Sequence, residues 1–101
     1  MAKAVASKVL DAVFGALAHP SRRQILVILH ARGGEMTAGE IADRFKHSWP
    51  TTTRHLGVLE KANVLKVGKR GRQRFYALRP RVLGRAGEWL CSWTRDAGDQ
   101  G

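Results

Sequence analysis

The sequence predicts a mainly α-helical domain completed by one small antiparallel β-hairpin. Apolar residues recur at helical spacings of three and four over much of the chain before Asn63, and two short β-branched and aromatic runs follow that residue. A chain of 101 residues accommodates one small domain with a single core. We therefore expect residues 1–101 to form one domain, without an internal repeat, a linker or a second core.

The first two helices are marked by their apolar spacing and by a proline. Apolar residues four apart predict a helix over residues 4–17. His19 precedes Pro20, which is tolerated in the first turn of a helix, so a second helix begins here with His19 as a substitute N-cap. Its girth is almost wholly apolar, which places it centrally, and Gly33 and Gly34 end it.

A third, short helix follows a candidate strand at Glu35 and Met36. Thr37 and Glu40 have the spacing of a capping box, in which each side chain accepts a hydrogen bond from the other residue's backbone. Apolar residues at helical spacing then continue to Phe45. This pattern predicts a helix of little more than two turns.

The fourth helix has clear signals at both ends. Ser48 is a favourable N-cap, and Asn63 tolerates the left-handed conformation that commonly ends a helix. Thr52, Leu56 and Leu59 share one face and are expected to point inward. Because a very short connection joins it to the preceding helix, the pair predicts a helix-turn-helix.

The opposite face of this helix suits an acceptor-rich surface. Its side chains can all donate a hydrogen bond, and no acidic residue precedes Glu60. The major groove of DNA presents many acceptors to such a face. The residues expected there are Trp49, Thr51, Thr53, Arg54 and His55.

A hairpin and a last helix complete the chain. Residues 64–67 and 73–78 predict two strands around the glycine-containing basic loop 68–72. Pro80 stops the second strand, and apolar spacing predicts a helix over residues 81–95. The polar residues 96–101 are expected to form a frayed tail.

The charge balance favours a polyanionic partner. Lys plus Arg number 18 against 8 Asp plus Glu, which gives a net charge of +10. No acidic residue lies between Glu60 and Glu88. The alternative is that these basic residues form only a solvated charged surface, but like charges on a tight hairpin repel one another when no counter-charge is present. Phosphates would supply the counter-charge. The sequence lacks a membrane span and a secretory segment, and with one cysteine we expect a cytoplasmic protein.

Three stretches resemble the ArsR/SmtB family of bacterial winged-helix repressors. They are Leu17–Leu26 (LAHPSRRQIL), Ser48–Leu59 (SWPTTTRHLGVL) and Arg70–Leu78 (RGRQRFYAL). The resemblance implies a winged helix-turn-helix and a homodimer built on the first and last helices. It also implies a pseudo-palindromic operator whose half-sites lie about 10 bp, or a multiple of that, apart. The implied dimer contacts are Val9, Val13, Leu83, Ala86, Trp89, Leu90 and Trp93.

The resemblance also assigns DNA contacts to the fourth helix and to the basic hairpin, its wing. Arg54 is expected on a guanine edge or a phosphate, Thr53 on a base or a phosphate, and Ser48 on a phosphate. Trp49 replaces a glutamine common in the family, and it could pack on a sugar, touch a thymine methyl group or pack on Phe45. The expected contacts are Ser48, Trp49, Thr51, Thr53, Arg54, His55, Lys69, Arg70, Arg72 and Arg74.

Metal sensing by the usual sites of the family is not expected. Thr37, Ala38 and Gly39 stand where members often carry a Cys-x-Cys motif, and the histidines lack ligand spacing. We therefore predict no metal and no cofactor, and no motif identifies a small-molecule or redox effector. Cys91 remains open between a redox sensor, a disulfide with its symmetry mate and a small buried apolar residue.

Two other functions compete with sequence-specific repression. A sequence-blind, nucleoid-type DNA-binding protein would also need the positive charge. A winged-helix protein-interaction module would need a neutral or apolar wing, whereas this hairpin is basic. An enzyme is not expected, because the sequence contains no phosphate loop, nucleophile elbow or paired carboxylates on one face.

Overall fold

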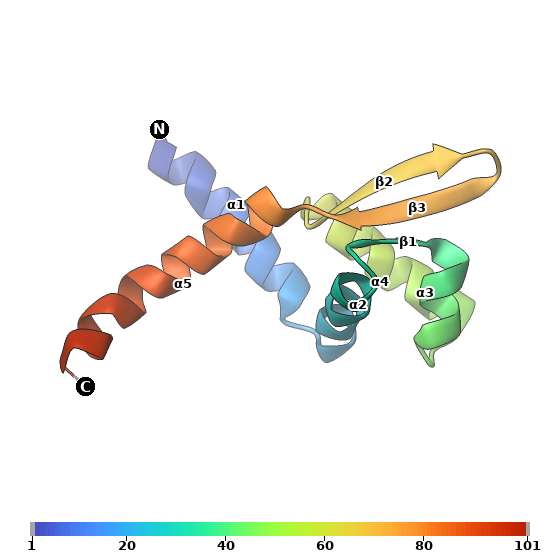
Figure 1. Ribbon diagram of the computed structural model, residues 1–101. Coiled ribbons are helices and arrows are strands. Elements are labelled where there is room, and N and C mark those ends of the chain that lie inside the picture. Colours follow the sequence, from blue (N-terminus) through green and yellow to red (C-terminus); the bar gives the residue numbers. More distant parts are fainter. Residues whose placement is uncertain (1, 101) are drawn as a thin grey trace.

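The computed structural model describes residues 2–100, with side-chain burial for residues 8–94. Figure 1 shows α1 and α5 crossing on one side of the molecule, and the helix-turn-helix and the sheet on the other. The architecture is the expected mainly α fold with an antiparallel hairpin. Within the described residues the elements are α1 (Ala2–Leu17), α2 (Pro20–Ala31), β1 (Glu35–Thr37), α3 (Ala38–Arg44), α4 (Trp49–Lys61), β2 (Leu65–Arg70), β3 (Gln73–Leu78) and α5 (Pro80–Gln100).

Local chemistry sets the ends of α2 and the beginning of α3. The His19 Nδ1 accepts a hydrogen bond from the Ser21 backbone N–H at 3.1 Å, so the imidazole caps α2 as predicted. Gly33 then adopts a φ of +91°, which a residue with a side chain rarely does. The capping box is confirmed, since the Thr37 Oγ1 and the Glu40 Oε1 each accept a backbone hydrogen bond at 3.0 Å.

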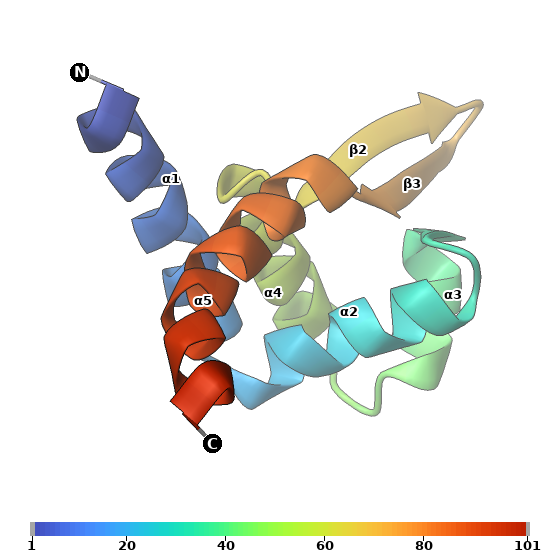
Figure 2. The same ribbon diagram turned by 60° about the vertical axis from the view of Figure 1, so that its left-hand side comes forward.

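The sheet has three antiparallel strands in the order β1-β3-β2. The predicted strand at Glu35 and Met36 is therefore confirmed as part of β1, which pairs with β3, the second strand of the hairpin. The predicted loop over residues 68–72 is too long, because β2 continues to Arg70, which pairs with Gln73. Gly71, with a φ of +63°, makes this two-residue turn feasible. Figure 2 shows the hairpin projecting beyond the helices.

The core lies between the helices and one face of the sheet. Partly buried residues of α1 and α5 pack against it, and the α1 and α5 rings of Phe14 and Trp89 lie 5.5 Å apart. The largest fully buried side chains include Ile25, Leu29, Met36, Ile41, Phe45, Leu56, Leu59 and Leu65.

The last helix is longer than predicted. α5 continues to Gln100, so the frayed tail expected over residues 96–101 is helical as far as that residue, while Gly101 lies outside the described part of the chain. No helix in residues 2–100 combines the length and apolar character needed to cross a membrane.

Candidate nucleic-acid interface

The first turn of α4 is organised by Ser48 and Thr51. The Ser48 Oγ accepts a hydrogen bond from the Thr51 backbone N–H at 3.3 Å, and the Ser48 hydroxyl donates to the Thr51 Oγ1 at 2.9 Å. Pro50 occupies the first turn, and Asn63 follows the helix with a φ of +62°, as expected. Two predicted DNA contacts, Ser48 and Thr51, therefore lie together at the beginning of α4.

α4 presents one buried and one exposed face. Thr52, Leu56 and Leu59 are buried as predicted, and the Thr52 hydroxyl donates to the Ser48 carbonyl at 3.0 Å. Trp49 is 55% exposed although it is a large aromatic residue. The exposed face carries Trp49, Thr53 and Arg54.

His55 does not belong to the exposed face, and its prediction as a DNA contact is wrong. It is 8% exposed, its ring centroid lies 4.6 Å from that of His19, and its Nδ1 lies 3.5 Å from a terminal nitrogen of Arg22. Burial lowers the pKa of His55, and the charges of His19 and Arg22 lower this pKa further. Positions 52, 55, 56 and 59 form a complete helical stripe, so His55 completes the inward face.

Arg22 and Arg23 have structural roles that the sequence analysis missed. The Arg22 Nε donates to the Ala16 carbonyl at 2.6 Å, and one of its terminal nitrogens donates to the Gly15 carbonyl at 3.3 Å. Arg23 donates to the Leu17 carbonyl at 2.7 Å. These guanidinium groups satisfy the last carbonyls of α1, which has no basic residue in its own last turn. Arg22 thereby joins α1 to His55 on α4.

The basic side chains of the hairpin are divided between the two faces of the sheet. Lys69 and Arg74 are register partners and share the face of the buried Tyr76. Arg70 lies on the other face, where its guanidinium is 3.1 Å from a Glu35 carboxylate oxygen and 4.3 Å from the centre of the Phe75 ring. Arg70 is thus paired with Glu35 at the surface of the sheet, in contrast to the other predicted hairpin contacts, Lys69, Arg72 and Arg74, for which the structure shows no ion pair among the described residues.

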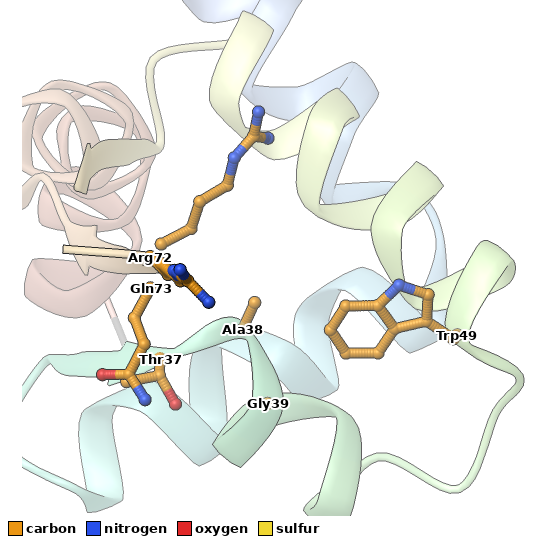
Figure 3. Close-up of a pocket in the computed structure, with 7 residues that line it drawn as sticks. Thr37, Ala38, Gly39, Trp49, Arg72 and Gln73 are labelled. Atoms are coloured by element: carbon orange, nitrogen blue, oxygen red, sulfur yellow. The ribbon is translucent and has the colours of Figure 1, made fainter. Parts of the chain in front are cut away.

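A pocket of about 380 Å³ separates the beginning of α4 from the hairpin turn. Figure 3 shows the Trp49 indole extending from α4 toward Ala38, with Arg72 and Gln73 on the far side. Trp49 at the beginning of α4 and two arginines of the hairpin, Arg72 and Arg74, therefore line the same pocket. Its lining is Thr37, Ala38, Gly39, Trp49, Arg72, Gln73 and Arg74.

Comparisons with known proteins agree on one family. A model of a helix-turn-helix domain matches residues 17–68. The transcriptional repressor SdpR of Bacillus subtilis (strain 168) is 37% identical over 84 residues, which cover 83% of this chain and 91% of SdpR. The solved structure of an ArsR family transcriptional regulator is 30% identical in sequence, with a TM-score of 0.76. The match covers 87% of this chain and 89% of the chain of that regulator. The chain belongs to the ArsR family of winged helix-turn-helix transcriptional regulators.

A more distant relative shares the fold of this ArsR-family chain. A homodimeric winged helix-turn-helix DNA-binding domain from Mycobacterium bovis is 23% identical with a TM-score of 0.70, covering 97% of this chain and 85% of its own. The family consists of transcriptional regulators and not of enzymes, as predicted.

The expected dimer contacts on α1 and α5 of this ArsR-family chain differ in how far they are buried. Val13 is 0% exposed and Ala86 is 4% exposed, because each packs inside the protomer where α1 and α5 meet the core. Neither has surface to offer a partner, so both are wrong as dimer contacts. Val9 and Leu83 are partly buried, whereas exposed apolar surface is provided by Trp89, Leu90 and Trp93.

Cys91 lies on α5, and its side chain is exposed. The interpretation of Cys91 as a small buried residue is therefore wrong for the protomer. Among the described residues, no group of three or more His, Cys, Asp or Glu side chains is arranged to hold a metal ion.

Proposed function

We propose that this ArsR-family protein is a homodimeric repressor that binds a pseudo-palindromic DNA operator. α4 lies in the major groove in this proposal, and the hairpin lies beside it as the wing. The observation that carries the proposal is the exposure of Trp49 and Arg54 on α4, which has no acidic residue before Glu60, with Trp49 lining the same pocket as Arg72 and Arg74 of the hairpin. Such a pairing suits base edges on one side and phosphates on the other.

The proposed contacts follow the exposed side chains. Arg54 reads a guanine edge or holds a phosphate, and Thr53 contacts a base or a phosphate from the same exposed face. Ser48 and Thr51 approach a phosphate at the first turn. The proposed wing contacts are Lys69, Arg72 and Arg74.

A dimer is supported by exposed apolar surface and by a relative. Trp89, Leu90 and Trp93 expose an apolar strip on α5, and the Mycobacterium bovis relative is described as homodimeric. Two copies related by a twofold axis would place two α4 helices on half-sites about 10 bp, or a multiple of that, apart. The regulated DNA and the protein would meet in the cytoplasm.

Selection of bound sequences from a random DNA pool tests this proposal. A repressor enriches one pseudo-palindromic motif, and it binds that motif at least about a thousandfold more tightly than random duplex at the same salt concentration. A nucleoid-type protein would bind every duplex with a similar affinity, and an interaction module would retain little DNA. Either of those results would overturn the proposal.

A further inference from the structure

The pocket between α4 and the hairpin has two chemically different walls. Arg72 lies across the pocket from the Trp49 indole (Figure 3), and Arg74 from the same hairpin also lines the pocket. None of the seven lining residues is acidic. Thr37 in the lining exchanges backbone hydrogen bonds with Glu40 in the capping box, and Ala38 and Gly39 belong to the first turn of α3, whose backbone N–H groups have no partner within the helix. A ligand that fits both walls carries negative charge beside an apolar surface.

The course of a DNA strand suggests such a ligand. If α4 occupies a major groove and the hairpin reaches the adjoining minor groove, the backbone that separates the two grooves must cross between them. The pocket lies between these two elements. A DNA backbone alternates negatively charged phosphates with deoxyribose rings, which matches the two walls.

We propose that this pocket holds one deoxyribose and its two flanking phosphates, and this inference rests on the proposed function. The Trp49 indole packs on the sugar, while Arg72 and Arg74 each bind one phosphate. The indole extends into the pocket, toward Ala38 (Figure 3), where this inference places a sugar. Trp49 remains 55% exposed, so packing within the protomer leaves more than half of its surface for a ligand. Trp49 therefore adds affinity without reading sequence.

Salt titrations test the arginine wall. Removing two phosphate contacts should reduce the slope of log affinity against log salt concentration by about 1.8. We expect this reduction for the double variant Arg72→Ala, Arg74→Ala on both the selected operator and a random duplex. Lys66→Ala is the matched control, because Lys66 lies on the opposite face of the sheet, with Arg70. An unchanged slope in the double variant, or an equal reduction per charge in the control, would overturn the inference.

Phosphate substitution locates the contact. Uncharged methylphosphonate linkages are placed one at a time along the selected operator. Two adjacent positions in each half-site should weaken binding by the wild-type protein but have no further effect on the double arginine variant. Adjacent positions that weaken both proteins equally would place the arginines elsewhere.

The tryptophan wall is tested separately. Trp49→Ala should weaken binding by about tenfold on the operator and on random duplex alike, since burying half an indole contributes roughly that much. Replacing each operator thymine by uracil should leave the Trp49 contribution unchanged. Loss of discrimination at one base pair in Trp49→Ala, or a uracil effect that this variant abolishes, would show that Trp49 reads a base. If the pool selection enriches no motif, the proposed function fails, whereas the salt slopes on random duplex still test the pocket.

Discussion

His55 illustrates how one residue can look like a ligand contact in the sequence and serve the core in the structure. It packs between His19, His47 and Phe45. Its Nδ1 accepts a long hydrogen bond, at 3.5 Å, from the Arg22 guanidinium. A protonated Nδ1 could not accept a hydrogen bond from Arg22. Charge on His55 therefore opposes the packing of α4 against the start of α2.

The lowered pKa of His55 predicts a loss of stability in mild acid. The unfolded chain binds a proton at His55 near its ordinary pKa of 6.5, whereas the folded chain binds this proton only at lower pH. The contribution of neutral His55 is complete above the unfolded pKa and is lost as pH falls through the folded pKa. Urea denaturation at pH 7.5 and 5.0 should show a smaller loss for His55→Gln than for the wild type.

His30→Gln is the control for this titration, because His30 is exposed near the end of α2, outside the histidine cluster. It should keep the wild-type loss between the two pH values. An identical pH dependence in His55→Gln and the wild type would show that His55 does not couple to folding.

Arg22 is expected to stabilise the fold through the end of α1. Arg22→Ala removes the charged donor from two carbonyls and should lower the free energy of unfolding by about 1.5–3 kcal/mol. Urea denaturation of Arg54→Ala, which removes an exposed arginine from α4, provides the comparison and should change stability by less than about 0.5 kcal/mol. Equal effects of the two variants would contradict the capping role.

Within each helix, local chemistry is sufficient to predict the ends. The residue roles that sequence spacing does not predict depend on tertiary packing. Ser48, Thr37 with Glu40, and Asn63 act on their own neighbours, so sequence spacing is sufficient to recognise them. The roles of Arg22 and His55 depend on how α1, α2 and α4 meet, which no local spacing states. Local spacing is nevertheless sufficient to place His55 on the inward face of α4, because positions 52, 55, 56 and 59 form one helical stripe.

The hairpin shows how strand pairing overrides local preference. Gly68 and the following basic residues have low strand propensity, which favoured a five-residue loop. Pairing along β3 extends β2 to Arg70, and a glycine with positive φ closes the turn in two residues. Arg70 then faces Glu35, so its pairing follows from register and could not be inferred from the charge run alone.

Gly71 and Gly68 form a matched pair for testing the turn. Gly71→Ala places a side chain at a φ of +63° and should lower the free energy of unfolding by about 1 kcal/mol. Gly68→Ala meets no atom within 4 Å of the added carbon and has an ordinary φ, so it should cost less. Equal losses in thermal or urea unfolding would show that the turn conformation is not the limiting feature.

At the scale of the whole molecule, the apolar strip on α5 and the basic surface of α4 and the hairpin belong to different parts of an elongated chain. The molecule measures 50 × 33 × 22 Å, and α5 runs from the base of the hairpin away from the hairpin turn (Figure 1). The interior packing of Val13 and Ala86 leaves the α5 tryptophans as the main apolar surface for a partner. This separation would let a dimer form without covering the proposed DNA contacts.

Trp93 provides the test of the dimer. It is 66% exposed, and an aromatic residue at the centre of an interface commonly dominates the binding energy. Trp93→Ala should raise the dimer dissociation constant by at least about tenfold in sedimentation equilibrium. Trp49→Ala removes an equally large side chain from the helix-turn-helix and should leave dimerisation unchanged. A wild-type protein that stays monomeric, or a Trp93→Ala dimer of wild-type strength, would contradict this interface.

Substitution of Arg54 shows whether the exposed face of α4 reads DNA sequence. The same random-pool selection is carried out with the wild-type protein and with Arg54→Ala. We expect a pseudo-palindromic motif for the wild type. For Arg54→Ala we expect the same motif with discrimination relaxed at one symmetric position in each half-site, by about 1–3 kcal/mol. An Arg54→Ala motif identical to that of the wild type would show that Arg54 holds only a phosphate, and no motif for the wild-type protein would contradict sequence reading by α4.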